Sequence, residues 1–421
     1  MSGMDKSRRT YLKTTGAIGA AGLTGLSGCI GSISGGGGGS GPIKTGSILP
    51  ITGALSAYGS GMQEAVNLAK KHINDADGPL GRELQVINKD SETKPDKANQ
   101  KYDALVNEEN IVGFVGAASS GVSVPLAKKV GSDQVMQVSN ASTSPALAQL
   151  GYNDDQSSKY FGRTAPNDGQ QGIVMGRILS ESKYIGADKA AFLYVNNAYG
   201  KGLAEKAKAA FKGETTAMVP YDKKSSDYTS TLDKVFEGDP GAVGFVGYPG
   251  NGQTILKQWQ NGGYGGQWVL SEGLNSSEFF QNLKEITDGM YLASPSPEGT
   301  DGASKFNNQM SAKNTLFAAH AYDGLFLQAL AMHKAGEASG KAIANNIRSV
   351  SRGGQKVTVG EFQKAKDLLD DGKDINFEGA SSPVDMNKSL EPLNRFAIMQ
   401  VKSGKAKELE TIPRSYFEGK L

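Results

Sequence analysis

The 421-residue sequence contains a single cysteine and only three histidines. The cysteine is Cys29, and the histidines are His72, His320 and His333. A disulfide within one chain needs two cysteines, so none can form, and a zinc site built from cysteine and histidine is not expected. The sequence therefore predicts no metal and no other cofactor.

An excess of one charge is also lacking. Lysine and arginine number 45 and aspartate and glutamate 43, which gives a formal net charge of +2. No long block of like charge breaks this balance, so neither nucleic acid nor an anionic membrane surface is predicted as a partner. With 38% hydrophobic residues, a chain of this length predicts two or three domains with buried cores.

The common catalytic motifs are missing as well. The sequence contains no G-x-S-x-G, no G-x-x-x-x-G-K-[ST] and no H-E-x-x-H. The nearest approach to the first of these is the segment 117–121, which has Ala117 where the first glycine would stand. A pair of catalytic carboxylates stays open, but no nucleophile or metal site supports a hydrolase, and an enzyme is not predicted.

The first 28 residues resemble an export signal rather than part of a folded domain. Arg8 and Arg9 precede a short apolar, glycine-rich run over residues 14–26, as in a twin-arginine signal. This run is too short to predict a membrane span. It ends in Leu26-Ser27-Gly28-Cys29, which resembles a lipobox, so we expect cleavage before Cys29 and lipidation of its side chain.

A glycine-rich tether follows the expected lipidation site, over residues 29–42. The alternative reading is a loop of small residues with an incidental cysteine. The order of the signal features favours an exported protein that is lipid-anchored on the outer face of the cytoplasmic membrane.

From residue 43 onward, short apolar segments alternate with segments of helical periodicity. Strands are expected at 43–49, 83–88, 111–115 and 135–138, and the rhythm restarts with strands at 190–195, 216–219, 242–246 and 267–270. Repeated β-α units predict parallel sheets covered by helices. Two such halves predict an α/β fold of two doubly wound lobes. A long helix expected at 317–335 returns to one of these lobes.

Polar and small residues follow two neighbouring strands of the first half. Ser120 lies at a predicted helix start after the strand 111–115, and Ala141 and Thr143 follow the strand 135–138. Ligands of doubly wound sheets bind beyond the carboxyl ends of the strands, and a helix N-terminus suits a carboxylate. Each cluster alone is typical of an ordinary helix N-cap, but two at adjacent strand ends favour an anion pocket.

The second half places acids and aromatic residues after its strands. Asp168 opens a predicted helix, where it could simply cap the helix, and Tyr199 and Tyr248 follow two strands. Glu272 comes directly after the apolar strand 267–270. An ionised carboxylate at a buried strand end needs a partner, which makes Glu272 a candidate for binding a cation.

The chain resembles the leucine/isoleucine/valine-type periplasmic binding proteins of ABC transporters. The resemblance spans residues 43 to about 335, and these segments carry it in order: 50–53, 58–59, 80–84, 116–120, 141–145, 163–164, 198–202, 247–248 and 271–273. It implies the type I periplasmic binding protein fold, with lobes joined by a multi-strand hinge. The expected boundaries are 43–164 plus 298–388 for lobe 1, and 165–297 plus 389–421 for lobe 2.

The same resemblance assigns roles to residues in the cleft between the lobes. It implies that Ser120, the backbone of Ala141 and Thr143 hold the ligand's carboxylate, and that Asp168 and Glu272 meet its ammonium group. It implies an aromatic wall made of Tyr58, Tyr199 and Tyr248, with Phe317 as a less close match. The family often has a disulfide near position 119, where this chain has serine.

The function expected from these residues is the binding of an amino acid, branched-chain or similarly apolar, with closure of the hinge. The expected partners are the permease subunits of an ABC transporter, together with the membrane through the lipid anchor. Two alternatives stay open: a binding protein for an amide, urea or a short carboxylate, and a ligand-sensing ectodomain that works with a partner.

Overall fold

The computed structural model describes residues 41–296, 298–312 and 315–420. The predicted export signal, Cys29 and all of the tether before residue 41 lie outside the described residues. Residues from Ser40 onward form one compact unit. Within the described ranges, no helix is both long and apolar enough to cross a bilayer.

The first half of the chain forms a five-stranded parallel sheet with the strand order β2-β1-β3-β4-β5. Its strands are β1 (Ile43–Leu49), β2 (Leu84–Asp90), β3 (Gly113–Gly116), β4 (Met136–Ser139) and β5 (Phe161–Arg163). Its connecting helices are α1 (Ser56–Asn74), η1 (Pro79–Gly81), α2 (Pro95–Asn107), α3 (Ser120–Ala127), α4 (Val130–Asp133) and η2 (Pro145–Gln149). The inner strands β3 and β4 are short and wholly buried, whereas the edge strand β2 is only partly buried.

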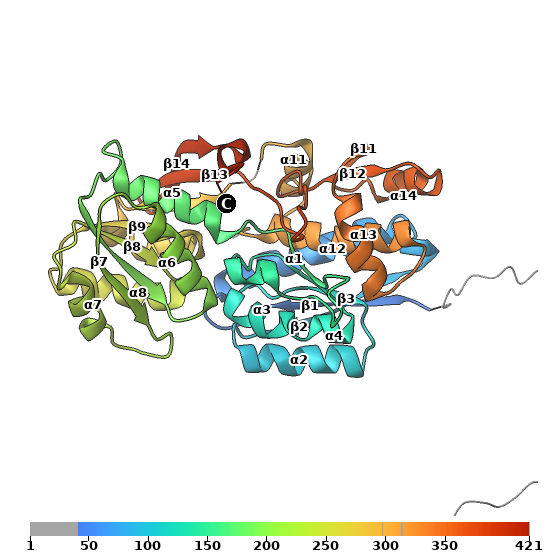
Figure 1. The fold of residues 1–421 in the computed structure, drawn as a ribbon, viewed down its shortest axis with the longest axis horizontal. Helices are drawn as coiled ribbons and strands as arrows, with labels where there is room; N and C mark the ends of the chain where they lie inside the picture. The colour runs from blue at the N-terminus through green and yellow to red at the C-terminus, as the bar shows by residue number, and fades with distance from the viewer. Residues whose placement is uncertain (1–40, 297, 313–314, 421) are drawn as a thin grey trace, which may run out of the picture. The chain divides into compact units, whose positions relative to one another are not determined.

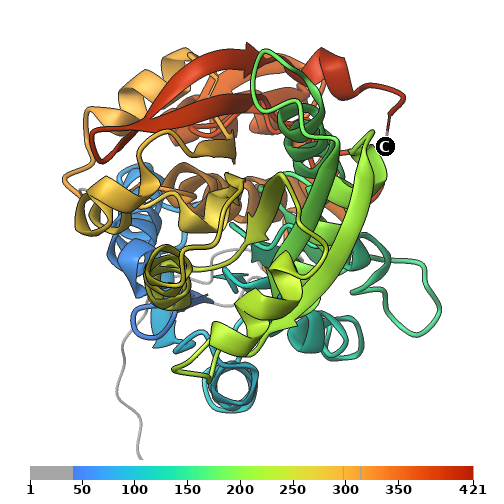
Figure 2. The ribbon, with the colours of Figure 1, turned by 90° about the vertical axis from the view of Figure 1, so that its left-hand side faces the viewer.

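A second sheet has seven strands in the order β14-β13-β10-β9-β8-β6-β7. Its strands are β6 (Lys189–Val195), β7 (Glu214–Tyr221), β8 (Ala242–Val246), β9 (Gln267–Ser271), β10 (Tyr291–Pro295), β13 (Phe396–Lys402) and β14 (Lys405–Ile412). Its helices are α5 (Asp168–Ser180), α6 (Ala198–Ala210), α7 (Thr229–Phe236), α8 (Pro249–Asn261), η3 (Glu272–Leu274), α9 (Ser277–Asn282), α10 (Lys284–Thr287) and η4 (Arg414–Phe417). The hairpin β13–β14, red in Figure 2, adds two antiparallel strands at one edge of this sheet.

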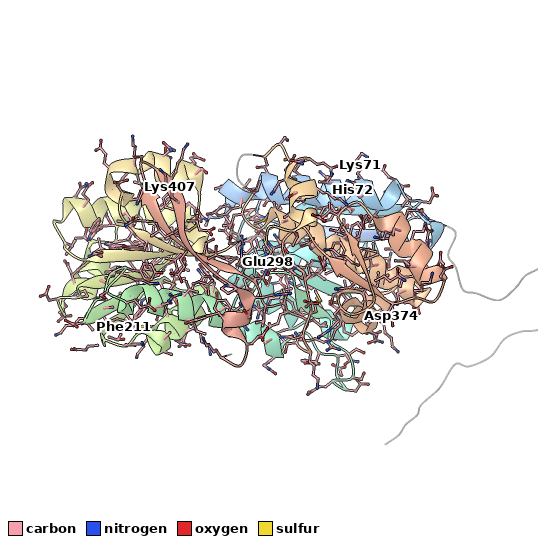
Figure 3. The ribbon with its side chains drawn as sticks, turned by 90° about the horizontal axis from the view of Figure 1, so that it is seen from above. Lys71, His72, Phe211, Glu298, Asp374 and Lys407 are labelled. Atoms are coloured by element: carbon pink, nitrogen blue, oxygen red, sulfur yellow. The ribbon has the colours of Figure 1, made fainter. Side chains whose placement is uncertain are left out.

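The chain passes between the two sheets three times. After β5 it enters α5, after β10 it returns to the helices beside the first sheet, and before β13 it crosses again. Glu298, labelled in Figure 3, lies in the second crossing. The returning segment contains α11 (Asp301–Asn307), α12 (Ala318–Ala335), α13 (Gly340–Val350), β11 (Gln355–Thr358), α14 (Phe362–Asp370) and β12 (Ile375–Glu378).

We call the first sheet with α1–α4 and α11–α14 the first lobe, and the second sheet with α5–α10 the second lobe (Figure 1). The predicted α/β fold of two parallel-sheet lobes is thus confirmed. The residue boundaries given for the lobes stay a prediction.

Helix α12 forms the centre of the first lobe. Every residue from Ala318 to Met332 is buried, and the helix contacts α1, α13, β3 and β4. The predicted helix at 317–335 is therefore confirmed. Further along the chain, α14 buries Phe362, Ala365 and Lys366.

Both lobes have the same strand order in their parallel part. In the first lobe, β1 lies between β2 and β3, and in the second lobe β6 lies between β7 and β8. The chain therefore leaves the central strand in opposite directions, which opens a crevice at the carboxyl ends of β1 and β3 and another at those of β6 and β8. These two crevices are where a ligand of such sheets is expected.

Asp323 of α12 fixes the start of the third crossing. Its buried carboxylate accepts hydrogen bonds from the backbone N–H groups of Ala380 and Ser381, at 2.7 and 2.9 Å, and from the Ser381 hydroxyl at 2.6 Å. Burial raises the pKa of Asp323 to about 7, against the opposing effect of these three bonds. The carboxylate is thus a buried acceptor whose loss would leave three donors without a partner.

We predict that Asp323→Ala lowers the free energy of unfolding by about 3 kcal/mol or more, because buried donors without partners are costly. Urea unfolding monitored by fluorescence measures the change. The matched control is Asp370→Ala, which removes an exposed carboxylate 2.9 Å from His333 and should cost about 0.5 kcal/mol or less. Equal stability of the two variants would contradict this role for Asp323.

Candidate functional site

A cavity lies where the carboxyl ends of the two sheets meet, and the empty space in it, with the solvent at its mouth included, is about 330 Å³. Residues of both lobes line it. They are Leu55, Tyr58, Met62, Ala118, Ser119, Ser120, Ala141, Leu316 and Phe317 from the first lobe, and Tyr199, Tyr248, Glu272 and Gly273 from the second. Most follow β1, β3, β6 or β8, so the cavity occupies the two crevices that the strand order creates.

Ser120, the first residue of α3, presents a hydrogen-bond donor to this cavity. Its buried Oγ accepts hydrogen bonds from the backbone N–H groups of Thr143 and Ser144, each at 3.1 Å. A hydroxyl has two lone pairs and one proton. Because both lone pairs are occupied, the proton is left to donate, and an anion in the cavity is the partner it suits.

The loop after β4 supplies the second part of the predicted anion site. Ala141 lines the cavity, whereas Thr143 does not. The Thr143 hydroxyl is buried and interacts with the Asp168 carboxylate. The structure thus brings Ser120 and Ala141 to the cavity and places the Thr143 side chain behind it.

Glu272 carries the acidic side of the cavity. It follows β9 directly, is 2% exposed, and its Oε2 accepts a hydrogen bond from the Tyr199 hydroxyl at 2.9 Å. Burial raises the pKa of Glu272 to about 7, against the lowering effect of hydrogen bonds from Tyr199, Gln171 and the backbone. Its position agrees with the expectation that an acid after a buried strand serves a cation.

Asp168, the first residue of α5, lies close to Glu272 but does not line the cavity. It is wholly buried, and the Thr143 side chain lies close enough to interact with its carboxylate. Burial raises the pKa of Asp168 well above its ordinary range and the negative charge of Glu272 raises it further, against the lowering effects of the Thr143 side chain and the positive charge of Arg163. In the described part of the chain, no lysine or arginine forms an ion pair with either acid.

Aromatic side chains close the cavity and connect the lobes. Tyr58 of α1 donates its hydroxyl proton to the backbone oxygen of Gly273 at 2.9 Å, and the hydroxyls of Ser119 and Tyr248 lie 2.9 Å apart. Tyr199 and Tyr248 stack at 5.6 Å. All four predicted aromatic residues, Phe317 included, line the cavity and are nearly buried.

Much of the apolar lining was not predicted from the sequence, namely Leu55, Met62, Ala118 and Leu316. Leu55, Tyr58 and Met62 fall on one helical face at the start of α1, which begins at Ser56. Gly59 and Gly61 weaken the helical signal of this first turn in the sequence. Gly59 is required there, because a Cβ atom would lie 2.3 Å from the Pro50 backbone oxygen.

The arrangement suits a small molecule that carries both charges. Hydroxyl and backbone groups of the first lobe face an anion, the acid of the second lobe faces a cation, and apolar side chains fill the remaining walls. In the described ranges, no three His, Cys, Asp or Glu side chains gather as a metal site would require.

We predict that raising the pH destabilises the ligand-free protein through Glu272. Its pKa in the folded state, about 7, exceeds its ordinary value of 4.5, so the folded state binds more protons between these values and loses stability as the pH rises. Glu272→Gln removes this cost. In urea unfolding, the free energy of unfolding of the variant relative to wild type should rise by about 2 kcal/mol between pH 5 and pH 8. A difference that is independent of pH would contradict the assignment, and the exposed Glu278→Gln is the control.

Comparisons with known proteins agree with this geometry. The family model for periplasmic binding proteins matches residues 42–383. The chain is 34% identical over 381 residues to the chemotactic signal transduction system substrate-binding protein BasB of Halobacterium salinarum, which covers 89% of this chain and 91% of that protein. It is 25% identical over 311 residues to the leucine-, isoleucine-, valine-, threonine- and alanine-binding protein of Pseudomonas aeruginosa, covering 71% and 80%.

A solved structure shows the same fold. The substrate-binding protein LivJ of a branched-chain amino acid transporter from Streptococcus pneumoniae, in complex with isoleucine, superposes with a TM-score of 0.72. Its sequence identity is 24%, and the match covers 88% of this chain and 99% of that one. The family match, the shared fold and the interlobe cavity agree, and the chain belongs to the periplasmic binding proteins of the leucine/isoleucine/valine type.

Proposed function

We propose that this protein binds an apolar amino acid as a zwitterion in the cavity between its lobes. The observation that carries the proposal is the buried Glu272 carboxylate, which lines the cavity and has no lysine or arginine partner among the described residues, together with the donor of Ser120 in the same lining. A zwitterion supplies the missing cation and the missing anion together. Charge-assisted hydrogen bonds of this kind contribute about 1.5–3 kcal/mol each.

The remaining walls favour an apolar side chain on the ligand. Leu55, Met62, Leu316 and Phe317 line the cavity, and Glu272 is the one charged residue among the described residues of its lining. A charged ligand side chain would lose its hydration there without gaining a partner. The names of the Pseudomonas and Streptococcus relatives, which refer to branched-chain and other small amino acids, support the same class of ligand.

A neutral amide, urea or a lone carboxylate fits this cavity less well. Each leaves Glu272 without a cation, so none of them offsets the cost of ionising this buried acid. These compounds are nevertheless informative probes, because each carries only part of a zwitterion.

A ligand panel tests the proposal. We expect an apolar amino acid at 100 times its dissociation constant to add about 2.7 kcal/mol to the free energy of unfolding, seen as a rise in melting temperature. The panel contains the twenty amino acids, simple amides, urea, and the matched pair of 4-methylpentanoate and isopentylamine, which resemble leucine without its ammonium or carboxylate group. Stabilisation by an amide or by the carboxylate, with no response to any amino acid, would contradict the proposal.

We predict that Glu272→Gln weakens binding of the amino acid at least tenfold, about 1.4 kcal/mol, because the amide cannot pair with the ammonium group. Asp168→Asn should act in the same direction through its charge. Titration calorimetry measures both, with Glu278→Gln as the control on an exposed neighbouring helix. Unchanged affinity in both variants would remove the two acids from the ligand site.

The family places the protein outside the cytoplasm, and we propose lipid anchoring through Cys29 after export by the twin-arginine route. We propose the permease subunits of an ABC transporter as the receiving partner. The chemotactic role in the name of the Halobacterium relative favours a second candidate, a membrane sensor that reads the closed form. Deleting the gene separates the two, because loss of amino acid uptake indicates the transporter and loss of chemotaxis with normal uptake indicates the sensor.

A further inference from the structure

Arg163 lies at the junction of the ligand site and two of the three lobe crossings. It is the last residue of β5, directly before the first crossing, and it is wholly buried. Its backbone N–H donates to the Leu390 oxygen of the third crossing at 2.9 Å. A buried guanidinium needs acceptors for its N–H donors. The acceptors of Arg163 lie in two segments, and one of them, Glu391, extends the contact to a third.

The first segment is the loop after β4. Nη1 of Arg163 donates to the backbone oxygens of Ser142 and Ser144, at 3.1 and 2.9 Å. In a trans peptide the C=O and N–H groups point in opposite directions. The peptide between Ser142 and Thr143 is therefore held at both ends, with its oxygen on Arg163 and its N–H on Ser120, the residue that faces the cavity.

The second segment is the third crossing, through Glu391. Nε and Nη2 of Arg163 both donate to Glu391 Oε2, the former at 2.9 Å. The charge of Arg163 and the hydrogen bonds from Arg163 and Asn167 lower the pKa of Glu391, although burial opposes them. Glu391 is thus an ionised partner inside the protein.

The third segment is the start of α5 in the second lobe. The other carboxylate oxygen of Glu391, Oε1, accepts a hydrogen bond from Asn167 Nδ2 at 3.1 Å. Asn167 caps α5, since its side-chain oxygen accepts from the N–H of Gly169 at 2.9 Å. The next residue is Asp168, whose own N–H donates to the Thr143 oxygen at 2.9 Å.

We propose that Arg163, Glu391 and Asn167 are positioning residues. They hold the loop after β4 in the first lobe in register with Asp168 at the start of α5 in the second lobe. The inference rests on the proposed function. Its added content is that these three side chains lie outside the cavity lining yet set the distance from the loop that holds Ser120 to Asp168, whose charge acts on Glu272. Ligand affinity, and not stability alone, should therefore depend on them.

Three variants test the link at different points. Arg163→Lys keeps the charge but loses the planar fork, so it cannot reach both carbonyls and Glu391. Glu391→Gln leaves a single acceptor oxygen for the donors of both Arg163 and Asn167. Asn167→Ser retains a helix cap but is too short to reach Glu391. The matched control is Glu410→Gln, which breaks an ion pair with Arg177 within the second lobe, away from the cavity.

Two measurements are compared across the four variants. Titration calorimetry with leucine should show a dissociation constant raised at least tenfold in Arg163→Lys, at least fivefold in Glu391→Gln and about threefold in Asn167→Ser, with no change in Glu410→Gln. Hydrogen exchange of the ligand-free protein should be faster at the Thr143 and Ser144 amides in Arg163→Lys and unchanged in Glu410→Gln. The second measurement needs no ligand, so it separates failure of this inference from failure of the proposed function.

Variants that lower the melting temperature but bind leucine with wild-type affinity would overturn the proposal and leave a purely structural ion pair. Wild-type exchange at Thr143 and Ser144 in Arg163→Lys would overturn it as well. If Arg163→Lys or Glu391→Gln does not fold, Asn167→Ser decides the matter, because its helix cap is preserved. Unchanged affinity in that variant contradicts the link.

Discussion

The binding site depends on one electrostatic constraint, the burial of two neighbouring carboxylates for which the described residues supply no ion-pair partner. Glu272 lines the cavity and Asp168 lies behind it, and burial raises the pKa of both acids. Ionising them in this buried site is costly, and a ligand with an ammonium group would remove that cost. This cost is the basis of the proposed selectivity for zwitterions, because the donors of the first lobe suit an anion at the same time.

The fold brings these opposed groups together by using one topology twice. Both sheets contain the strand order in which a central strand lies between the next two along the chain, and each therefore opens a crevice at the same kind of edge. Three crossings join the lobes so that the two crevices face each other. The contacts at this junction include direct interlobe hydrogen bonds from Tyr58 and between Ser119 and Tyr248, which a closed state requires.

Much of this could be predicted from the sequence, because short apolar strands, helical periodicity and polar residues at strand ends are local signals. Ser120, Ala141, Glu272 and the four aromatic residues were expected near a ligand, and all seven line the cavity. The rest depends on contacts distant in sequence. Leu55 and Met62 were missed because Gly59 and Gly61 obscured the start of α1, and the placement of Thr143 and Asp168 behind the lining is set by packing. The bond between Arg163 and Glu391 joins residues 228 positions apart, which no local pattern indicates.

Proton release on binding tests the central claim most directly. If the ligand's ammonium group ionises the buried acids, leucine binding at pH 7 must expel protons, because Glu272 has a pKa of about 7 before the ligand enters. Calorimetric titrations in two buffers with different heats of ionisation give the number of protons exchanged. The account predicts net release that is smaller in the Glu272→Gln variant, where Asp168 is the remaining buried acid. Binding of leucine with no proton exchanged, or with protons taken up, would contradict it.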